Sequence, residues 1–124
     1  MEAEHWFIGP QLIGLIFVVV GFIQKRFPPK HINALYGYRM PSSMKNQQTW
    51  DEANCYSAKY MIKCGFILLI AGLVTAIVLS LIPMHEKLRT GINAILMITG
   101  AIGSCVLLLV YTEKHLSKTF DQQP

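Results

Sequence analysis

The sequence predicts an all-α membrane protein with three transmembrane helices, a long polar cytoplasmic loop and a second helix that extends into the cytoplasm. Of its 124 residues, 52% are hydrophobic and only 15% are charged, whereas about a quarter of a soluble domain is charged. The charged residues are absent from three long apolar blocks. Each block is close to the roughly 20 residues that a helix needs to cross a ~30 Å hydrocarbon layer.

The three blocks are separated by polar segments and belong to one domain, residues 1–124. The predicted spans lie at about 6–23, 64–82 and 91–111, and the polar loop occupies 24–60. We expect helices because a lone strand would leave its backbone hydrogen bonds unmade in lipid. Acidic residues precede the first block, and basic residues and two prolines follow it. This pattern favours a retained span over a cleaved signal peptide.

The basic residues are distributed unevenly between the two predicted sides of the membrane. Nine of the 11 Lys and Arg residues lie in the first loop, at the start of the second helix or in the C-terminal tail, and two lie in the second loop. The positive-inside rule therefore predicts an external N-terminus and a cytoplasmic C-terminus. We interpret the net charge of +4 as an orientation signal and an affinity for anionic lipid headgroups. We expect no nucleic-acid partner.

Several classes of function lack their usual residues. No Asp, Glu, Lys or Arg lies in the middle of a predicted span, which argues against a proton-coupled pump. The three cysteines have no paired spacing and the four histidines are divided between the two sides, so we expect no metal and no cofactor. No nucleophile elbow or phosphate-binding glycine loop is present. We therefore expect a non-enzyme without catalytic residues, and an enzyme acting on lipid headgroups is the alternative.

Small residues recur at helical spacing in all three blocks. They are Gly14 and Gly21 in the first, Gly65, Gly72 and Ala76 in the second, and Gly100, Gly103 and Ser104 in the third. Helices in lipid associate through close packing at such residues. The pattern fits a compact three-helix bundle and equally a homo-oligomer.

The second helix is expected to begin well before its apolar block. Thr49 and Glu52 have the spacing of a capping box, and no Pro or Gly follows Trp50 until Gly65. We therefore expect one helix that starts in the cytoplasm and continues into the second span. Its predicted buried face carries Trp50, Asn54, Ser57 and Met61.

The polar loop contains the most distinctive pattern in the chain. It reads Asn33-x-x-Tyr36-Gly37-Tyr38-Arg39-x-Pro41-x-Ser43-Met44-x-Asn46-x-x-x-Trp50-x-x-Ala53-Asn54. This pattern resembles the signature of the SdpI family of bacterial membrane proteins. In that family an N-x-x-(F/Y)-G-x-R-T motif is followed downstream by a Trp and an Asn or His. Met40 stands where the family pattern has Thr.

The resemblance implies three spans in a bacterial inner membrane, with the motif between the first two. It also implies a role in immunity, because the founding member protects a toxin-producing cell from its own secreted antimicrobial peptide. That protein also holds a repressor at the membrane. The implied partners are thus a peptide toxin or its target, and a cytosolic repressor. The corresponding alternative function is a signalling scaffold that sequesters a transcriptional regulator.

The candidate binding residues all come from the motif, and each has a structural interpretation beside the functional one. They are Asn33, Tyr36, Gly37, Tyr38, Arg39, Pro41, Ser43, Asn46, Trp50 and Asn54. The guanidinium of Arg39 suits a carboxylate or phosphate, including a lipid headgroup.

The structural interpretations are more specific. Arg39 could instead form an ion pair with Asp51, Glu52 or Glu113. Trp50 is interpreted as an interfacial anchor or a loop-packing residue, and the tyrosines are expected at the headgroup level. The asparagines are expected to brace the loop. Asn54 needs a hydrogen-bond partner, for which Asn46, Ser43 and Arg39 are the candidates.

Overall fold

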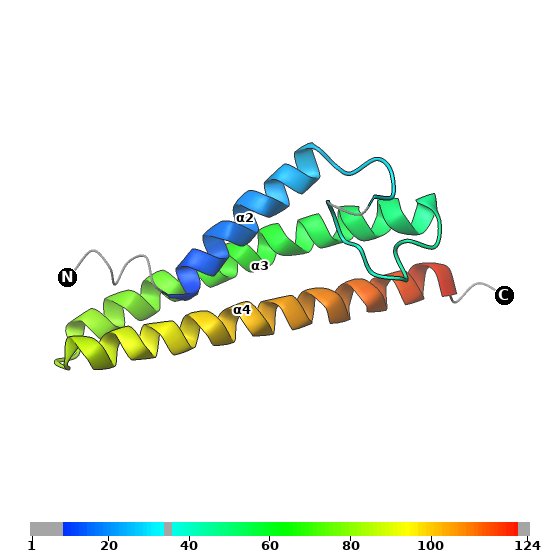
Figure 1. Cartoon of the computed structure of the whole chain (residues 1–124). Coiled ribbons are helices and arrows are strands. Elements are labelled where there is room, and N and C mark those ends of the chain that lie inside the picture. Colours follow the sequence, from blue (N-terminus) through cyan, green and yellow to red (C-terminus); the bar gives the residue numbers. More distant parts are fainter. Residues whose placement is uncertain (1–8, 34–35, 122–124) are drawn as a thin grey trace.

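The computed structural model describes residues 9–33 and 36–121, and these residues form three helices and a terminal turn (Figure 1). The elements are α2 (Pro10–Arg26), α3 (Gln47–Leu81), α4 (Glu86–Leu116) and the π-helical turn η1 (Ser117–Asp121). The all-α prediction is confirmed for this part of the chain. Residues 6–8 of the first predicted span lie outside the described residues.

Helix α3 is a single unbroken helix of 35 residues. At 1.5 Å per residue it is roughly 50 Å long, well beyond the ~30 Å of a hydrocarbon layer. The predicted extension of the second helix beyond its apolar block is therefore confirmed. The helix begins at Gln47 rather than at Trp50.

The N-terminus of α3 is capped by residues other than the predicted pair. The side chain of Asn46 accepts a hydrogen bond from the Thr49 amide at 2.9 Å, and Thr49 Oγ1 accepts from the Asn46 amide at 3.2 Å. The predicted Thr49–Glu52 box was thus wrong by one helical turn. Asn is a strong N-cap residue, and the Glu52 carboxylate pairs with α4 instead.

Two helices have the length and apolar composition of membrane spans, namely Gln47–Leu81 and Glu86–Phe120. Their large apolar side chains point outward, with Ile70 62% exposed and Ile95 65% exposed. A core helix of a soluble protein would bury such residues. Helix α2 has 17 described residues and extends past the predicted limit at residue 23 to Arg26.

The helix ends match local chemistry. Helix α2 stops at Phe27, directly before two consecutive prolines, which cannot continue a helix. The last carbonyls of α3 are bound by Arg89 of α4, which donates to Leu79 O at 3.3 Å and Ile82 O at 3.0 Å. The short connection between α3 and α4 is thereby fixed.

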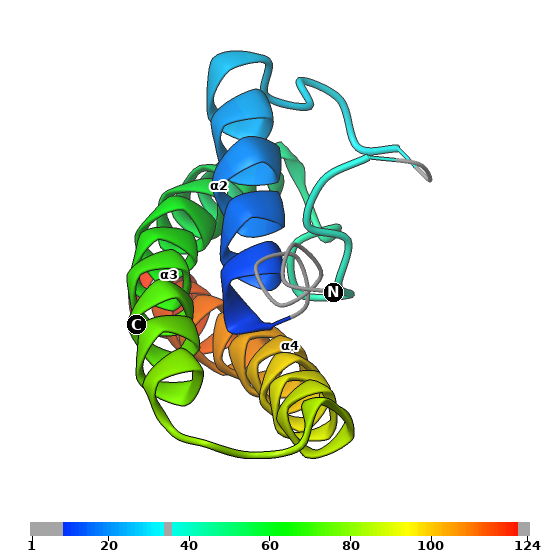
Figure 2. The ribbon, with the colours of Figure 1, turned by 90° about the vertical axis from the view of Figure 1, so that its left-hand side faces the viewer.

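Helix α2 packs tightly on α3 in an antiparallel arrangement, and α4 lies along another side of α3 (Figures 1 and 2). Glycines make the α2–α3 approach possible. A Cβ atom on Gly14 would lie 2.5 Å from Gly65 O, and one on Gly65 would lie 2.7 Å from Gly14 O. Gly21 and Gly72 are equally confined by the opposite helix. The predicted close packing at these glycines is confirmed for the first two helices.

The small residues of α4 have a different role. Gly100 is near Leu68 and Pro10, at 3.7 and 3.8 Å from a built Cβ, whereas a Cβ on Gly103 would meet nothing within 4 Å. Gly103 therefore lies outside the close-packed contacts of the chain. Helix α2 starts near α4 and moves away from it toward Arg26 (Figure 1).

We predict that Gly65→Ala destabilises the chain by roughly 1–3 kcal/mol, because the new methyl group meets backbone atoms of α2 that have no free space to move into. Gly91→Ala is the matched control, since a Cβ there meets nothing within 4 Å. The two midpoints of thermal unfolding in detergent provide the measurement. Equal midpoints would show that the glycine contact does not determine α2–α3 packing.

Candidate functional site

The candidate site is the segment between α2 and α3, here called the motif segment (residues 33–46, described apart from 34–35). It returns from the end of α2 to the start of α3 and lies against the ends of α3 and α4 (Figure 1). Side chains of α3 bind its backbone, Glu113 of α4 binds two of its side chains, and Gln24 of α2 acts through Asn54.

Asn54 of α3 is the central support. Its Oδ1 accepts a hydrogen bond from the Tyr38 amide at 2.6 Å, and its Nδ2 donates to Trp50 O at 2.9 Å. Gln24, near the end of α2, donates from Nε2 to Asn54 O at 2.8 Å and to Ser57 Oγ at 2.9 Å. All these side chains are buried. One cluster therefore joins α2, α3 and the motif segment.

Asn54 has partners other than those expected. Ser43, Asn46 and Arg39 were the predicted candidates, and that prediction was wrong. A backbone amide of the segment and the helix's own carbonyl satisfy the Asn54 side chain instead. Buried backbone amides and carbonyls need hydrogen-bond partners. This explains why Asn54 binds backbone groups and not the predicted side chains.

Gly37 allows the segment to approach Asn54. Its φ of 104° lies in a region that L side chains rarely adopt. A Cβ there would lie 2.5 Å from Asn54 Oδ1 and 2.8 Å from Pro29 Cγ. Glycine is thus required at this position both for its backbone conformation and for space.

Trp50 is completely buried, with 0% exposure, and its Nε1 donates to Pro29 O at 2.7 Å. It packs the loop onto α3 rather than anchoring the chain at the membrane interface. Asn54, Ser57 and Met61 are also buried, so the predicted buried face of this helix is confirmed.

A tight turn orders the second half of the motif segment. Pro41 follows Met40 in a turn closed by the Ser43 amide and Met40 O at 2.9 Å, and Pro is favoured at this turn position. Ser43 is fully buried, and its Oγ lies 3.0 Å from Tyr38 O and accepts from the Met40 amide at 3.1 Å. Thr49 Oγ1 then donates to Ser43 O at 3.0 Å. The turn is thereby tied to the first turn of α3.

The first half of the segment is braced locally. Asn33 Oδ1 accepts from the Tyr36 amide at 2.8 Å, and its Nδ2 donates to His31 O at 2.9 Å. The Tyr36 hydroxyl donates to Phe27 O at 2.9 Å. Asn33, Asn46 and Asn54 all brace the loop through hydrogen bonds, as expected for the asparagines.

Tyr38 connects the segment to α4. The side chain is buried, with 7% exposure, and its hydroxyl donates to Glu113 Oε1 at 2.8 Å. Ser42 donates to the same oxygen at 2.6 Å. Burial raises the pKa of Tyr38 well above its usual range, and the hydrogen bond to Glu113 and its negative charge raise it further. The Tyr38 hydroxyl is thus bound within the protein, and the headgroup level expected for this residue stays a prediction.

A second contact joins the same ends of α3 and α4. His115 Nε2 lies 2.6 Å from Glu52 Oε1, and the His115 ring stacks on Tyr56 with centroids 4.2 Å apart. The motif segment thus rests on a platform in which all three helices are cross-linked by polar side chains.

Arg39 differs from its neighbours because it is exposed. Its predicted structural partners are engaged elsewhere: Asp51 accepts from Gln47 at 2.7 Å, Glu52 pairs with α4, and Glu113 binds Tyr38 and Ser42. Within the described part of the chain no polar contact holds its guanidinium. The backbone on both sides is fixed by the Tyr38 and Met40 amide bonds. Arg39 is therefore a free cation on a fixed backbone.

Three supports of the site were not recognised in the sequence. Glu113 was considered only as an ion-pair partner of Arg39, and Gln24 and His115 were assigned no contact, although all three side chains support the site. The sequence signal that could have revealed Gln24 was its position as a lone Gln at the end of an apolar block. A buried side-chain amide requires hydrogen-bond partners, so it indicates a contact with another element. No cluster of three His, Cys, Asp or Glu side chains suited to a metal occurs among residues 9–33 and 36–121.

The fold and site define a helical protein with span-like helices and a polar segment clamped at one end of them. Comparison with known proteins places this architecture in a family. The model of the SdpI/YfhL protein family matches residues 30–112, and the chain belongs to this family. It is 39% identical over 104 residues to the uncharacterized protein YfhL of Bacillus subtilis (strain 168), covering 83% of this chain and 81% of the relative. No solved structure matches the chain.

We predict that Asn54→Ala destabilises the protein by about 1–3 kcal/mol, because it leaves the buried Tyr38 amide and Gln24 side chain with fewer partners. Arg39→Ala should change stability by less than about 0.5 kcal/mol, since that side chain is exposed. Thermal unfolding and limited proteolysis of the motif segment measure both effects. Equal behaviour of the two variants would contradict the central role of Asn54.

The raised pKa of Tyr38 predicts a specific alkaline sensitivity. The folded chain holds this proton at a pH where the unfolded chain has lost it, so the stabilisation is complete below pH 10.0, the ordinary tyrosine value, and decreases above it. Wild type should therefore lose stability more steeply than Tyr38→Phe as the pH rises above that value. Unfolding midpoints measured across this range test the difference. Parallel curves for the two proteins would contradict it.

Proposed function

We propose that the chain crosses a bacterial inner membrane three times, with α2 as the first span. The motif segment then lies on the cytoplasmic side, together with the C-terminus. The uneven distribution of the 11 basic residues supports this orientation. The motif segment and the ends of α2 and α4 that carry Arg26 and Lys114 lie at the same end of the molecule (Figure 1), as the orientation requires.

On this framework we propose that the protein confers immunity against a secreted antimicrobial peptide toxin. Membership in the SdpI/YfhL family supports this role, since the founding member protects its producer in this way. The observation that carries the proposal is the pre-ordered motif segment, which presents Arg39 without an internal partner. Binding energy is used efficiently when the binding group is already held in place.

Arg39 is the residue proposed to bind the toxin or its target. A guanidinium presents a rigid fork of donors that binds carboxylates and phosphates with two parallel hydrogen bonds. The fixed Tyr38 and Met40 backbone sets the point from which this side chain extends. The proposed partner group is therefore an acidic side chain, a peptide carboxyl terminus or a phosphate. The chain acts in this role by binding, without covalent chemistry.

We predict that expression in a toxin-sensitive bacterium raises the inhibitory concentration of at least one secreted antimicrobial peptide in a purified panel. Arg39→Ala should lose this protection while accumulating normally in the membrane, because the fold does not use this side chain. Arg39→Lys, which keeps the charge but not the planar fork, should recover only part of it. Membrane fractions probed with an epitope tag provide the control for expression.

Two results would contradict the proposal. The first is an unchanged inhibitory concentration for every peptide although the wild-type protein is present in the membrane. The second is full protection by Arg39→Ala. This result would leave the immunity function standing but would show that Arg39 is not the binding residue. Capture of a cytosolic transcriptional regulator by wild type, combined with no protection, would favour the scaffold function instead.

A further inference from the structure

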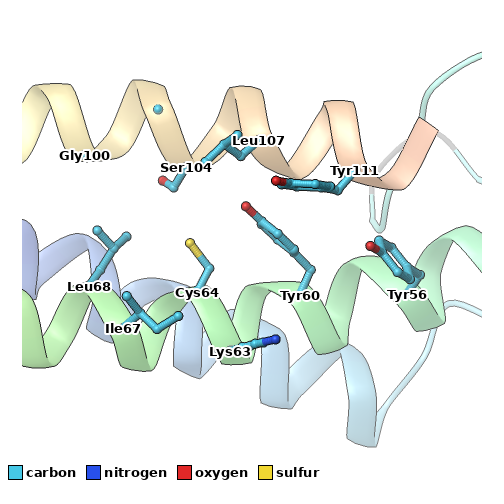
Figure 3. A pocket seen from close by; sticks show the side chains of 11 residues that line it. Tyr56, Tyr60, Lys63, Cys64, Ile67, Leu68, Gly100, Ser104, Leu107 and Tyr111 are labelled. Carbon is cyan, nitrogen blue, oxygen red and sulfur yellow. The ribbon is translucent and has the colours of Figure 1, made fainter. Parts of the chain in front are cut away.

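Helices α3 and α4 leave a groove between them that the motif segment does not occupy. The α3–α4 groove has a volume of about 630 Å³, within the range of about 300–1,000 Å³ typical of ligand sites. Figure 3 shows side chains of both helices facing each other across it. Its lining includes Tyr60, Lys63, Ile67, Gly103, Leu107 and Tyr111.

The groove is closed at both ends. At one end the three helices meet, where Gly100 approaches Leu68 and Pro10. At the other end Tyr56 stacks on His115, which also contacts Glu52. A helix from a second copy is about 10 Å wide with its side chains. A slender, flexible acyl chain fits between these contacts more readily.

The middle of the groove has free space. A Cβ on Gly103 meets nothing within 4 Å. The adjacent Ser104 hydroxyl already donates to Ala101 O at 3.1 Å, so it makes no polar demand on an occupant. This region therefore suits an apolar ligand.

The groove is polar at one end and apolar at the other. The rings of Tyr60 and Tyr111 lie 5.8 Å apart, and both hydroxyls point into the groove (Figure 3). Lys63 also lines the groove and has an exposed side chain. Ile67 and Leu107 line its apolar part, and both are exposed. Such a gradient matches an amphiphile with an anionic head and a hydrocarbon tail.

We propose that the α3–α4 groove binds one acyl chain of an anionic phospholipid whose phosphate lies at Lys63. The inference rests on the membrane placement proposed above, in which Lys63 is near the cytoplasmic headgroups. Long basic side chains reach the interface from such positions, and anionic lipids attract them. The lipid would fill the space between α3 and α4 and support the platform beneath the motif segment.

The test uses the full-length chain purified in mild detergent. Native mass spectrometry counts retained lipid after incubation with mixed vesicles of phosphatidylglycerol and phosphatidylcholine that carry the same acyl chains. Gly103→Leu fills the groove, and Gly91→Leu is the matched control, because a Cβ at either glycine meets open space. Lys63→Gln removes the cation without filling the groove.

Wild type and Gly91→Leu should retain one phosphatidylglycerol per chain, and Gly103→Leu should lose it. Lys63→Gln should reduce the preference for phosphatidylglycerol over phosphatidylcholine by about five-fold, the effect of about one unit of charge near the surface. Equal retention by all four proteins, or equal loss in both leucine variants, overturns the proposal. A changed oligomeric state in Gly103→Leu alone would also overturn it and assign the groove to a second copy.

These outcomes are independent of the immunity assay. Lipid retention is measured without any toxin, and survival is measured without counting lipids. Membrane fractionation tests the placement that both share. Protection by a Gly103→Leu protein that retains no lipid would leave the proposed immunity intact while separating it from the groove.

Discussion

The arrangement of the candidate site depends on the hydrogen bonds of Asn54. Its side chain fixes the Tyr38 amide of the motif segment, while its own backbone carbonyl receives Gln24 of α2. A buried amide is costly unless its donors and acceptors are satisfied. Here, satisfying the Asn54 and Gln24 side chains requires α2, α3 and the motif segment to be in place together. Buried hydrogen bonds thus order the site, whereas the outer surfaces of the helices are apolar.

The close approach of α2 and α3 is a precondition for that cluster. Gln24 reaches Asn54 and Ser57 only because Gly14, Gly21 and Gly65 let the two helix backbones come together. Larger side chains at the crossing would move the end of α2 away from α3. Glycine spacing in one part of the molecule therefore determines the geometry of a segment far along the chain. Helix packing in lipid through small residues has this consequence whenever a polar cluster lies at the end of the contact.

The sequence predicted the elements better than their contacts. Apolar block lengths and the face carrying Trp50 follow from local periodicity, so the helices and the buried side of α3 were predictable. Which end groups meet in space depends on how the helices are arranged. The partners of Asn54 and the Glu113 bond to Tyr38 join residues 16 and 75 positions apart. No local pattern specifies such pairs, and several carboxylates near Arg39 were equally plausible partners.

The capping error illustrates the same limit at short range. Thr49 occurs in two overlapping capping patterns, one with Asn46 before it and one with Glu52 after it. Both are locally acceptable. In the structure Glu52 pairs with His115 of α4, Asn46 is the cap, and α3 begins at Gln47. The added turn brings the start of α3 directly against the Ser43 carbonyl, which Thr49 binds. The start of α3 at this position thus holds the motif turn in place, and the exposed Arg39 projects from the segment so fixed.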